Sequence, residues 1–185
     1  MEFKDELFSI IKEEPLNLKI LKAVRDLDLD DCWVGAGFIR NNVWNKLHKI
    51  RNVDIDYDID VVFYFPEDTS ISYEEELEKK LLAIIPNLKW SAKNQARMHL
   101  KNGHKNYVNV LDAISYWPET ATSIAIRLDE FNNLDLIAPY GLADLFNLIV
   151  KPTPKFDASI VEKRLVEKKW LTRWRKLKLH DQASR

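Results

Sequence analysis

The sequence contains little cysteine, little glycine and no long apolar run, and each shortage excludes a class of protein. A single cysteine, Cys32, excludes an internal disulfide framework and a thiolate cluster for structural zinc. Four glycines in 185 residues exclude low-complexity and Gly-rich repeat architectures. No apolar run approaches the roughly 20 residues that cross a bilayer, and the charged residues of segment 1–15 are unlike a signal peptide. We therefore expect a cytoplasmic, globular protein with no membrane partner.

The chain as a whole carries almost no net charge, but individual segments are strongly charged. Its 28 Lys and Arg oppose 29 Asp and Glu, a formal charge of −1 that argues against a general nucleic-acid coat protein and against duplex DNA as a partner. Residues 54–80 contain ten acids and two bases, whereas residues 32–53 and 89–105 contain bases and no acid. Residues 155–178 contain nine bases and three acids. Such opposed blocks suit a site that holds a cation and a polyanion together, or they are solvated faces of separate elements.

Hydrophobic periodicity predicts an α/β (α+β) fold, a mixed sheet flanked by helices with helical N- and C-terminal extensions. Strands are expected at residues 32–34, 59–65 and 89–94, with a hairpin formed by 124–128 and 134–136. Helices are expected at residues 3–12 and 15–27 and from about residues 39, 72, 138 and 159. Ser72 and Glu75 have capping-box spacing at the start of one of them.

We expect a single domain made of an N-terminal helical extension (1–31), a core (32–154) and a C-terminal basic amphipathic helix (155–185). The apolar face of the last helix consists of Val166, Trp170, Trp174 and Leu177. The opposite face is mainly basic, and it is either solvated or available to bind RNA. We favour a solvated helix that its tryptophans pack against the core.

Two short motifs predict the chemistry. The turn Gly35-Ala36-Gly37 joins a strand to a helix, where exposed backbone N–H groups form a phosphate site. Asp58 and Asp60 are two residues apart on a strand, so both carboxylates face the same side. Such a pair is unfavourable unless a cation neutralises it, and carboxylates with substrate phosphates commonly hold Mg²⁺. The two motifs together predict a site for a metal-bound nucleoside triphosphate.

Cationic side chains are expected to neutralise the triphosphate. The best candidates are Arg40, Lys93 and Arg97. Arg97 is preferred because its planar donor fork matches phosphate oxygens. Asp54 and Asp56 would face the same side as the acid pair if the strand extended to them. They precede the apolar run, however, so we expect them in a loop.

Seven segments resemble the signature blocks of a bacterial nucleotidyltransferase family of mostly unassigned substrate, within the DNA polymerase beta-like nucleotidyltransferase superfamily. They are WVGAGFIRN (33–41), VW (43–44), LH (47–48), DIDV (58–61), KNQARMH (93–99), WPETAT (117–122) and APYGLADL (138–145). The resemblance spans about residues 33–154. It implies a nucleotidyltransferase fold in which the glycine turn holds the triphosphate and the paired aspartates hold divalent metal, Mg²⁺ or Mn²⁺.

Two features depart from the pattern of that superfamily. The 21 positions from Gly37 to Asp58 exceed the usual spacing, so an extra loop intervenes. The superfamily also commonly uses a third carboxylate on the next sheet strand, but segment 89–94 contains no acid. The alternatives for that place are Asn94 on the strand itself and Glu119 or Asp112 from elsewhere in the chain.

The sequence thus predicts a metal-dependent nucleotidyltransferase that moves a nucleoside monophosphate from an NTP, expected to be ATP, to an acceptor hydroxyl with release of pyrophosphate. The acceptor is a small molecule, a protein or an RNA. The alternative is a non-catalytic nucleotide-binding or regulatory module on the same fold. The expected catalytic and metal-binding residues are Asp58 and Asp60, and the expected nucleotide-binding residues are Gly35, Ala36, Gly37, Arg40, Lys93, Asn94 and Arg97.

Overall fold

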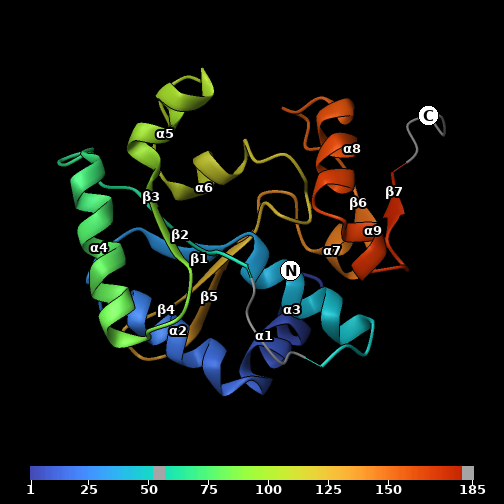
Figure 1. Ribbon diagram of the computed structural model, residues 1–185, viewed down its shortest axis with the longest axis horizontal. Coiled ribbons are helices and arrows are strands. Elements are labelled where there is room, and N and C mark those ends of the chain that lie inside the picture. Colours follow the sequence, from blue (N-terminus) through green and yellow to red (C-terminus); the bar gives the residue numbers. More distant parts are fainter. Residues whose placement is uncertain (52–56, 181–185) are drawn as a thin grey trace.

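The computed structural model describes residues 1–51 and 57–180, and a five-stranded mixed sheet lies at its centre (Figure 1). The strand order is β3-β2-β1-β4-β5. β1 is antiparallel to both β2 and β4, β2 and β3 are parallel, and β4 and β5 form the expected hairpin. The strands are β1 (Cys32–Gly35), β2 (Ile59–Phe63), β3 (Trp90–Asn94), β4 (Ala125–Leu128) and β5 (Leu134–Ile137).

Helices flank this sheet, as the sequence predicts. The first four are α1 (Lys4–Glu13), α2 (Pro15–Arg25), α3 (Gly37–Leu47) and α4 (Ile71–Ile84). The later elements are α5 (Gln95–Asn102), α6 (Val110–Ile114), α7 (Ala143–Phe146), β6 (Ile149–Val150), α8 (Ala158–Glu167), α9 (Trp170–Arg173) and β7 (Lys178–Leu179). Within residues 1–51 and 57–180, none of these helices has the length and apolar character of a membrane span.

The two faces of the sheet bury different clusters. Val61 and Phe63 of β2 belong to the main core, which also contains buried residues of α1 to α4. Val62 points to the other face, where it packs with Trp33 and with residues of α6. Because side chains alternate along a strand, Asp60 shares the face of Val62, at the end of β2 where the strand begins. The acidic residue therefore lies at the rim of the smaller cluster.

Carboxylates of α4 cover the outer edge of β3. Glu74 accepts a hydrogen bond from the backbone N–H of Asn94, and Glu78 accepts one from the N–H of Ala92, both at 2.8 Å. An edge strand otherwise presents unpaired N–H groups to solvent. Figure 1 shows α4 running along this side of the sheet. The α4 carboxylates thus satisfy the edge that the sheet order leaves open.

Two expected helices differ from the sequence pattern. The segment from residue 138 forms only the short α7, because Ile149 enters β6 and pairs with β7. The continuous helix expected from about residue 159 is interrupted at Lys169, which has a left-handed φ of 52°. As a result Trp170 and Trp174 are buried as expected, whereas Val166 is 76% exposed. The periodicity was right for the tryptophans and wrong for the helix as a whole.

The start of α4 also differs from the expected capping box. Ser70 is the N-cap, and its side chain accepts a hydrogen bond from the backbone N–H of Tyr73 at 3.2 Å. Ser72 lies inside the helix and donates to the hydroxyl of Ser70. The capping-box prediction at Ser72 was therefore wrong by two residues, and the helix itself was predicted at the right place.

Candidate functional site

The acid pair and the glycine turn meet at one end of the sheet. Because β1 and β2 are antiparallel, the end of β1 lies beside the start of β2, with Val34 opposite Val61. The backbone N–H of Gly37 donates a hydrogen bond to the carboxylate of Asp60. Asp58 directly precedes β2 and is exposed. The structure thus brings together the two motifs that the sequence singled out.

The turn has a conformation that only small residues allow. A Cβ atom on Gly35 would lie 2.9 Å from Cη2 of Trp117 and 3.2 Å from the carbonyl oxygen of Ile124, so a side chain does not fit there. Ala36 has a positive φ of 50° and donates its N–H to that same Ile124 oxygen at 3.2 Å. With the N–H of Gly37 on Asp60, the turn orients the acidic residue directly.

The charge of Asp58 and burial affect the protonation of Asp60. Burial, and then the negative charge of Asp58, raises the pKa of Asp60 to about 6. The cations of Arg40 and Lys168 and the Gly37 hydrogen bond act in the opposite direction. A carboxylate with a raised pKa beside a second carboxylate is a site where additional positive charge is favourable.

Arg40 places a buried guanidinium next to the pair. Its side chain is 8% exposed, its Nη1 donates to the hydroxyl of Thr122 at 3.2 Å, and its Cζ lies 4.1 Å from the centre of the Trp170 ring. Burial lowers the pKa of Arg40 to about 10, and the negative charge of Glu119 opposes this shift most strongly. The Nε atom of Arg40 is buried and has no hydrogen-bond partner among the described residues. Arg40 is therefore a charged donor with capacity to bind an anion.

A cavity of about 260 Å³ connects these groups. Its walls are formed by the turn, the start of α3, the start of β2 and the C-terminal elements α8 and α9. The charged residues that line it are Arg40, Asp58, Asp60, Arg164, Lys168 and Arg173. Four cationic side chains thus face two carboxylates in one small space, which suits a metal-bound polyanion.

The register of the sheet shows what lies beside the acid pair. Because β3 is parallel to β2, Asp60 is opposite Ser91, whereas Asn94 is opposite Phe63 at the far end of the strand. The side chain of Asn94 accepts from the N–H of Phe65 at 3.1 Å and donates to its carbonyl at 2.6 Å. Asn94 therefore holds a loop away from the pair, and the strand position next to Asp60 is a serine.

The other candidates for a third carboxylate have partners of their own. Glu119 is fully buried and accepts a hydrogen bond from Nε of Arg164 at 2.6 Å. Asp112 accepts the N–H of Val108 at the start of α6. Across residues 1–51 and 57–180, no three His, Cys, Asp or Glu side chains gather as a metal site. Residues 54 and 56, both aspartates, lie outside the described residues.

Two of the expected phosphate-binding cations lie at the opposite end of β3. Arg97 forms two hydrogen bonds of 2.8 Å to the carboxylate of Glu74, which is 2% exposed. Lys93 lies 3.0 Å from Glu78 and 3.6 Å from Glu74. Neither cation is among the described residues that line the cavity. Their geometry supports a role in holding α4 on the edge of the sheet.

The C-terminal elements supply cations that the sequence analysis did not assign to the site. Trp174, the residue directly after α9, donates its indole N–H to Asn45 of α3 at 2.8 Å, and it packs edge to face on Trp44 at 5.1 Å between ring centroids. The backbone N–H of Lys176 donates to His48 at 3.0 Å. These contacts hold α8 and α9 against α3. The sequence feature that could have identified these cations is the composition of residues 155–178, which contain nine bases and three acids, in contrast to the acidic residues 54–80.

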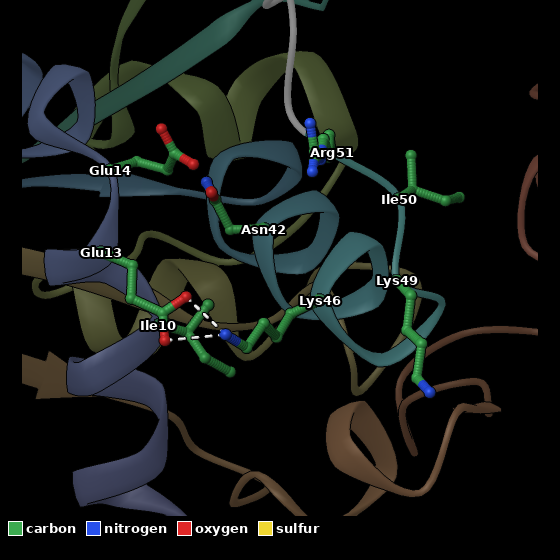
Figure 2. A pocket seen from close by; sticks show the side chains of 8 residues that line it. All are labelled: Ile10, Glu13, Glu14, Asn42, Lys46, Lys49, Ile50 and Arg51. Atoms are coloured by element: carbon green, nitrogen blue, oxygen red, sulfur yellow. Dashed lines mark hydrogen bonds and ion pairs between the residues drawn. The ribbon is translucent and has the colours of Figure 1, made fainter.

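A larger cavity, of about 520 Å³, lies between α1 and α3 (Figure 2). Its most prominent charges, Glu13 and Lys46, neutralise each other through contacts of 2.6 and 2.8 Å. Figure 2 shows Lys49 and Ile50 pointing away from this ion pair. The cavity has neither the adjacent acid pair nor the glycine turn, so we place the candidate site at the smaller one.

Comparisons with known proteins bear on the family and the fold of this chain. A family model described as nucleotidyltransferase matches residues 22–179. A protein whose NMR structure is described as revealing a CCA-adding enzyme head domain is 38% identical, with a TM-score of 0.84 and 96% of each chain covered. No curated protein sequence matches the chain.

Longer chains of CCA-adding enzymes share the fold at lower identity. The Thermotoga maritima CCA-adding enzyme complexed with tRNA has a TM-score of 0.59 at 16% identity, covering 96% of this chain and 43% of that one. A CCA-adding enzyme with ATP has a TM-score of 0.59 at 15% identity, covering 99% and 44%. The chain thus spans less than half the length of these two enzymes.

Proposed function

We propose that this chain, which belongs to the nucleotidyltransferase family whose model it matches, transfers a nucleoside monophosphate from an NTP to an acceptor hydroxyl at the cavity beside Asp58 and Asp60. The observation that carries the proposal is the convergence of the carboxylate pair, the turn at Gly37 and the buried guanidinium of Arg40 in one cavity. Each of these features occurs in many proteins, but their conjunction has a specific chemical use.

The donor set fits a hard divalent cation. Asp58 and Asp60 offer carboxylate oxygens. Burial and the charge of Asp58 raise the pKa of Asp60 to about 6, so a cation bound beside the two carboxylates would be favourable. Two carboxylates, with substrate phosphates and waters completing the shell, form the usual kind of Mg²⁺ site. When bound, Mg²⁺ or Mn²⁺ would supply charge stabilisation for the attacking and leaving oxygens.

The residues of the chain would then position and neutralise the substrate. Arg40 would bind phosphate oxygens, and the turn of Gly35, Ala36 and Gly37 would hold Asp60 in its orientation. The acceptor oxygen attacks the α-phosphorus with loss of the hydroxyl proton, and the bond to the β-phosphate breaks so that pyrophosphate leaves. Positioning and electrostatic stabilisation account for most of the rate enhancement in reactions of this kind.

The test is a metal-dependent nucleotide screen with the Asp60→Ala variant. The parent protein, incubated with cell extract, Mg²⁺ and each of the four labelled NTPs, is expected to label an acceptor, which mass spectrometry identifies by its mass shift. Asp135→Ala is the matched control, because Asp135 is also a strand carboxylate but forms only a part-exposed ion pair with Arg127. Labelling lost in Asp60→Ala and kept in Asp135→Ala supports the proposal.

Two results would contradict it. Labelling by Asp60→Ala at the parent rate removes the acid pair from the mechanism. Nucleotide binding by the parent without labelling of any small molecule, protein or RNA would favour a non-catalytic nucleotide-binding module. The same screen shows which NTP is preferred, since ATP is our expected donor, and which of the three acceptor classes is used.

A further inference from the structure

The segment of residues 117–124 is a polar loop that is buried beside the acid pair. Glu119, Thr120, Thr122 and Ser123 are each at most 4% exposed. Their backbone is held by the neighbouring segment, since the N–H of Thr120 donates to the carbonyl of Lys151 at 3.0 Å. Burying polar groups is costly unless they are satisfied. The hydroxyls of Thr120 and Ser123 donate to Asp144 and to the carbonyl of Glu119, and Thr122 accepts from Arg40, whereas one carboxylate oxygen of Glu119 has no hydrogen-bond partner among the described residues. Glu119 is therefore the residue of this loop that requires an explanation beyond packing.

Glu119 is the charged residue of this loop, and it joins two arginines of the cavity. One carboxylate oxygen accepts from Nε of Arg164 at 2.6 Å, while the other is buried and has no hydrogen-bond partner among the described residues. Its charge also favours the protonated form of Arg40 more than any other group does. The two terminal nitrogens of the Arg164 guanidinium carry further N–H donors, and Arg164 also lines the cavity.

Arg164 and Arg40 line the cavity from different helices. Arg40 lies in the first turns of α3, and Arg164 lies on α8, more than one hundred residues later in the sequence. Lys168, one helical turn after Arg164, also lines the cavity and lowers the pKa of Asp60 through its charge. The C-terminal part of α8 and its C-cap residue therefore bring two cations to the cavity that contains the acid pair.

The charge of the cavity favours a polyanion. Four cationic and two anionic side chains line it, and the buried carboxylate of Glu119 is bound to Arg164. The positive charges outnumber the negative ones by one when Glu119 is included, and a divalent cation on the acid pair would raise this excess to three.

We propose that Arg164 of α8, Lys168 directly after this helix and Arg40 of α3 form a subsite for the terminal phosphates of the NTP, and that Glu119 is the residue that positions Arg164 in it. This inference rests on the proposed transfer reaction and adds which end of the substrate the C-terminal elements bind. The phosphates leave this subsite together as pyrophosphate after transfer.

The test measures binding of AMP, ADP and ATP in the presence of Mg²⁺ by titration calorimetry. Arg164→Gln is expected to raise the Kd for ATP about tenfold or more, to raise that for ADP less, and to leave that for AMP unchanged, since charge-assisted hydrogen bonds to phosphate are of that strength. Lys163→Gln is the matched control, because Lys163 precedes Arg164 on α8 and is 76% exposed. It should leave all three affinities unchanged.

Removing Arg164 alone leaves the Glu119 charge buried and unpaired, which can unfold the protein. The double variant Arg164→Gln/Glu119→Gln removes both charges and keeps side-chain volume, so it tests the subsite in a folded chain. Glu119→Gln alone should weaken ATP binding more than AMP binding, because it releases Arg164 without removing it. A purely structural role for Glu119 would instead change the affinity for all three nucleotides by one factor.

The outcomes separate this inference from the proposed function. Equal losses for AMP, ADP and ATP in the double variant, or unchanged ATP binding, overturn the subsite while leaving nucleotidyl transfer intact. Inorganic tripolyphosphate, which lacks the nucleoside, should bind Asp60→Ala but not the Arg164 variants. If the parent bound tripolyphosphate in this Arg164-dependent way yet transferred no nucleotide, the subsite would stand and the transfer reaction would fall.

Discussion

Replacing Asp60 by Asn should make the metal-free protein more stable while it abolishes nucleotidyl transfer. Burial and the charge of Asp58 raise the pKa of Asp60 from 3.8 to about 6, so the folded state binds this proton more tightly than the unfolded state does. Between these two pKa values the folded state holds more protons, and stability therefore falls as the pH rises. Above pH 6 the full cost of the buried charge is present.

The size of the effect follows from the two pKa values. A shift of one unit corresponds to about 1.4 kcal/mol, so ionised Asp60 costs as much as about 3 kcal/mol at pH 7.5 and about 1.5 kcal/mol at pH 5. Asn has nearly the same shape, carries no charge, and its carbonyl oxygen can keep the hydrogen bond from Gly37. Asp60→Asn should therefore gain stability, and its gain should double between pH 5 and pH 7.5.

Urea denaturation in EDTA at these two pH values measures the gain as a shift in midpoint at constant slope. Glu75→Gln, which removes an exposed carboxylate of α4, is the neutral control. Adding Mg²⁺ should stabilise the parent and have little effect on Asp60→Asn, because a ligand that binds only the folded state stabilises it. An Asp60→Asn protein less stable than the parent at pH 7.5, or a gain independent of pH, would refute the electrostatic account of the pair.

Three further substitutions test other parts of the structure. Arg97→Ala should cost about 3 kcal/mol by leaving the buried Glu74 carboxylate underpaired, with an unchanged KM for ATP; a raised KM at unchanged stability would restore Arg97 to the nucleotide site. Gly35→Ala should cost about 1–3 kcal/mol in thermal denaturation, because its Cβ collides with Trp117; parent stability would show that the ring moves freely. Asn45→Ala should cost about 1–3 kcal/mol in urea denaturation by leaving the buried indole N–H of Trp174 without its acceptor, and an unchanged midpoint would contradict that anchoring role.

The acid pair and the turn could be located from the sequence because both depend on local patterns. Alternation along a strand places Asp58 and Asp60 on one face, and small residues between a strand and a helix mark the turn. The positions of Asn94 and Arg97 depend instead on the direction of β3. A strand–helix–strand unit in one sheet is normally parallel, and a parallel β3 puts its last residues far from the start of β2, as Phe63 opposite Asn94 shows.

The sequence predicts the apolar and basic character of the C-terminal segment but not where this segment packs. Its tryptophans and its excess of bases are evident in the sequence, yet no Gly or Pro marks the interruption at Lys169. The interruption occurs because Trp170 and Trp174 both pack on Trp44 of α3, a tertiary contact that overrides local propensity. Periodicity shows that a face is apolar and cannot show which element it meets, so the direction of Arg164 into the cavity required the structure.

The anchoring of α9 on α3 has a consequence for how the protein folds. The hydrogen bond from Trp174 to Asn45 joins residues 129 positions apart, and contacts of such separation form late because a long loop must first be closed. The sheet and the turn can assemble from residues 32–137 before this closure. During synthesis the acid pair would therefore exist for a time without the cationic wall from α8, and the complete cavity would appear only after the C-terminal segment has left the ribosome.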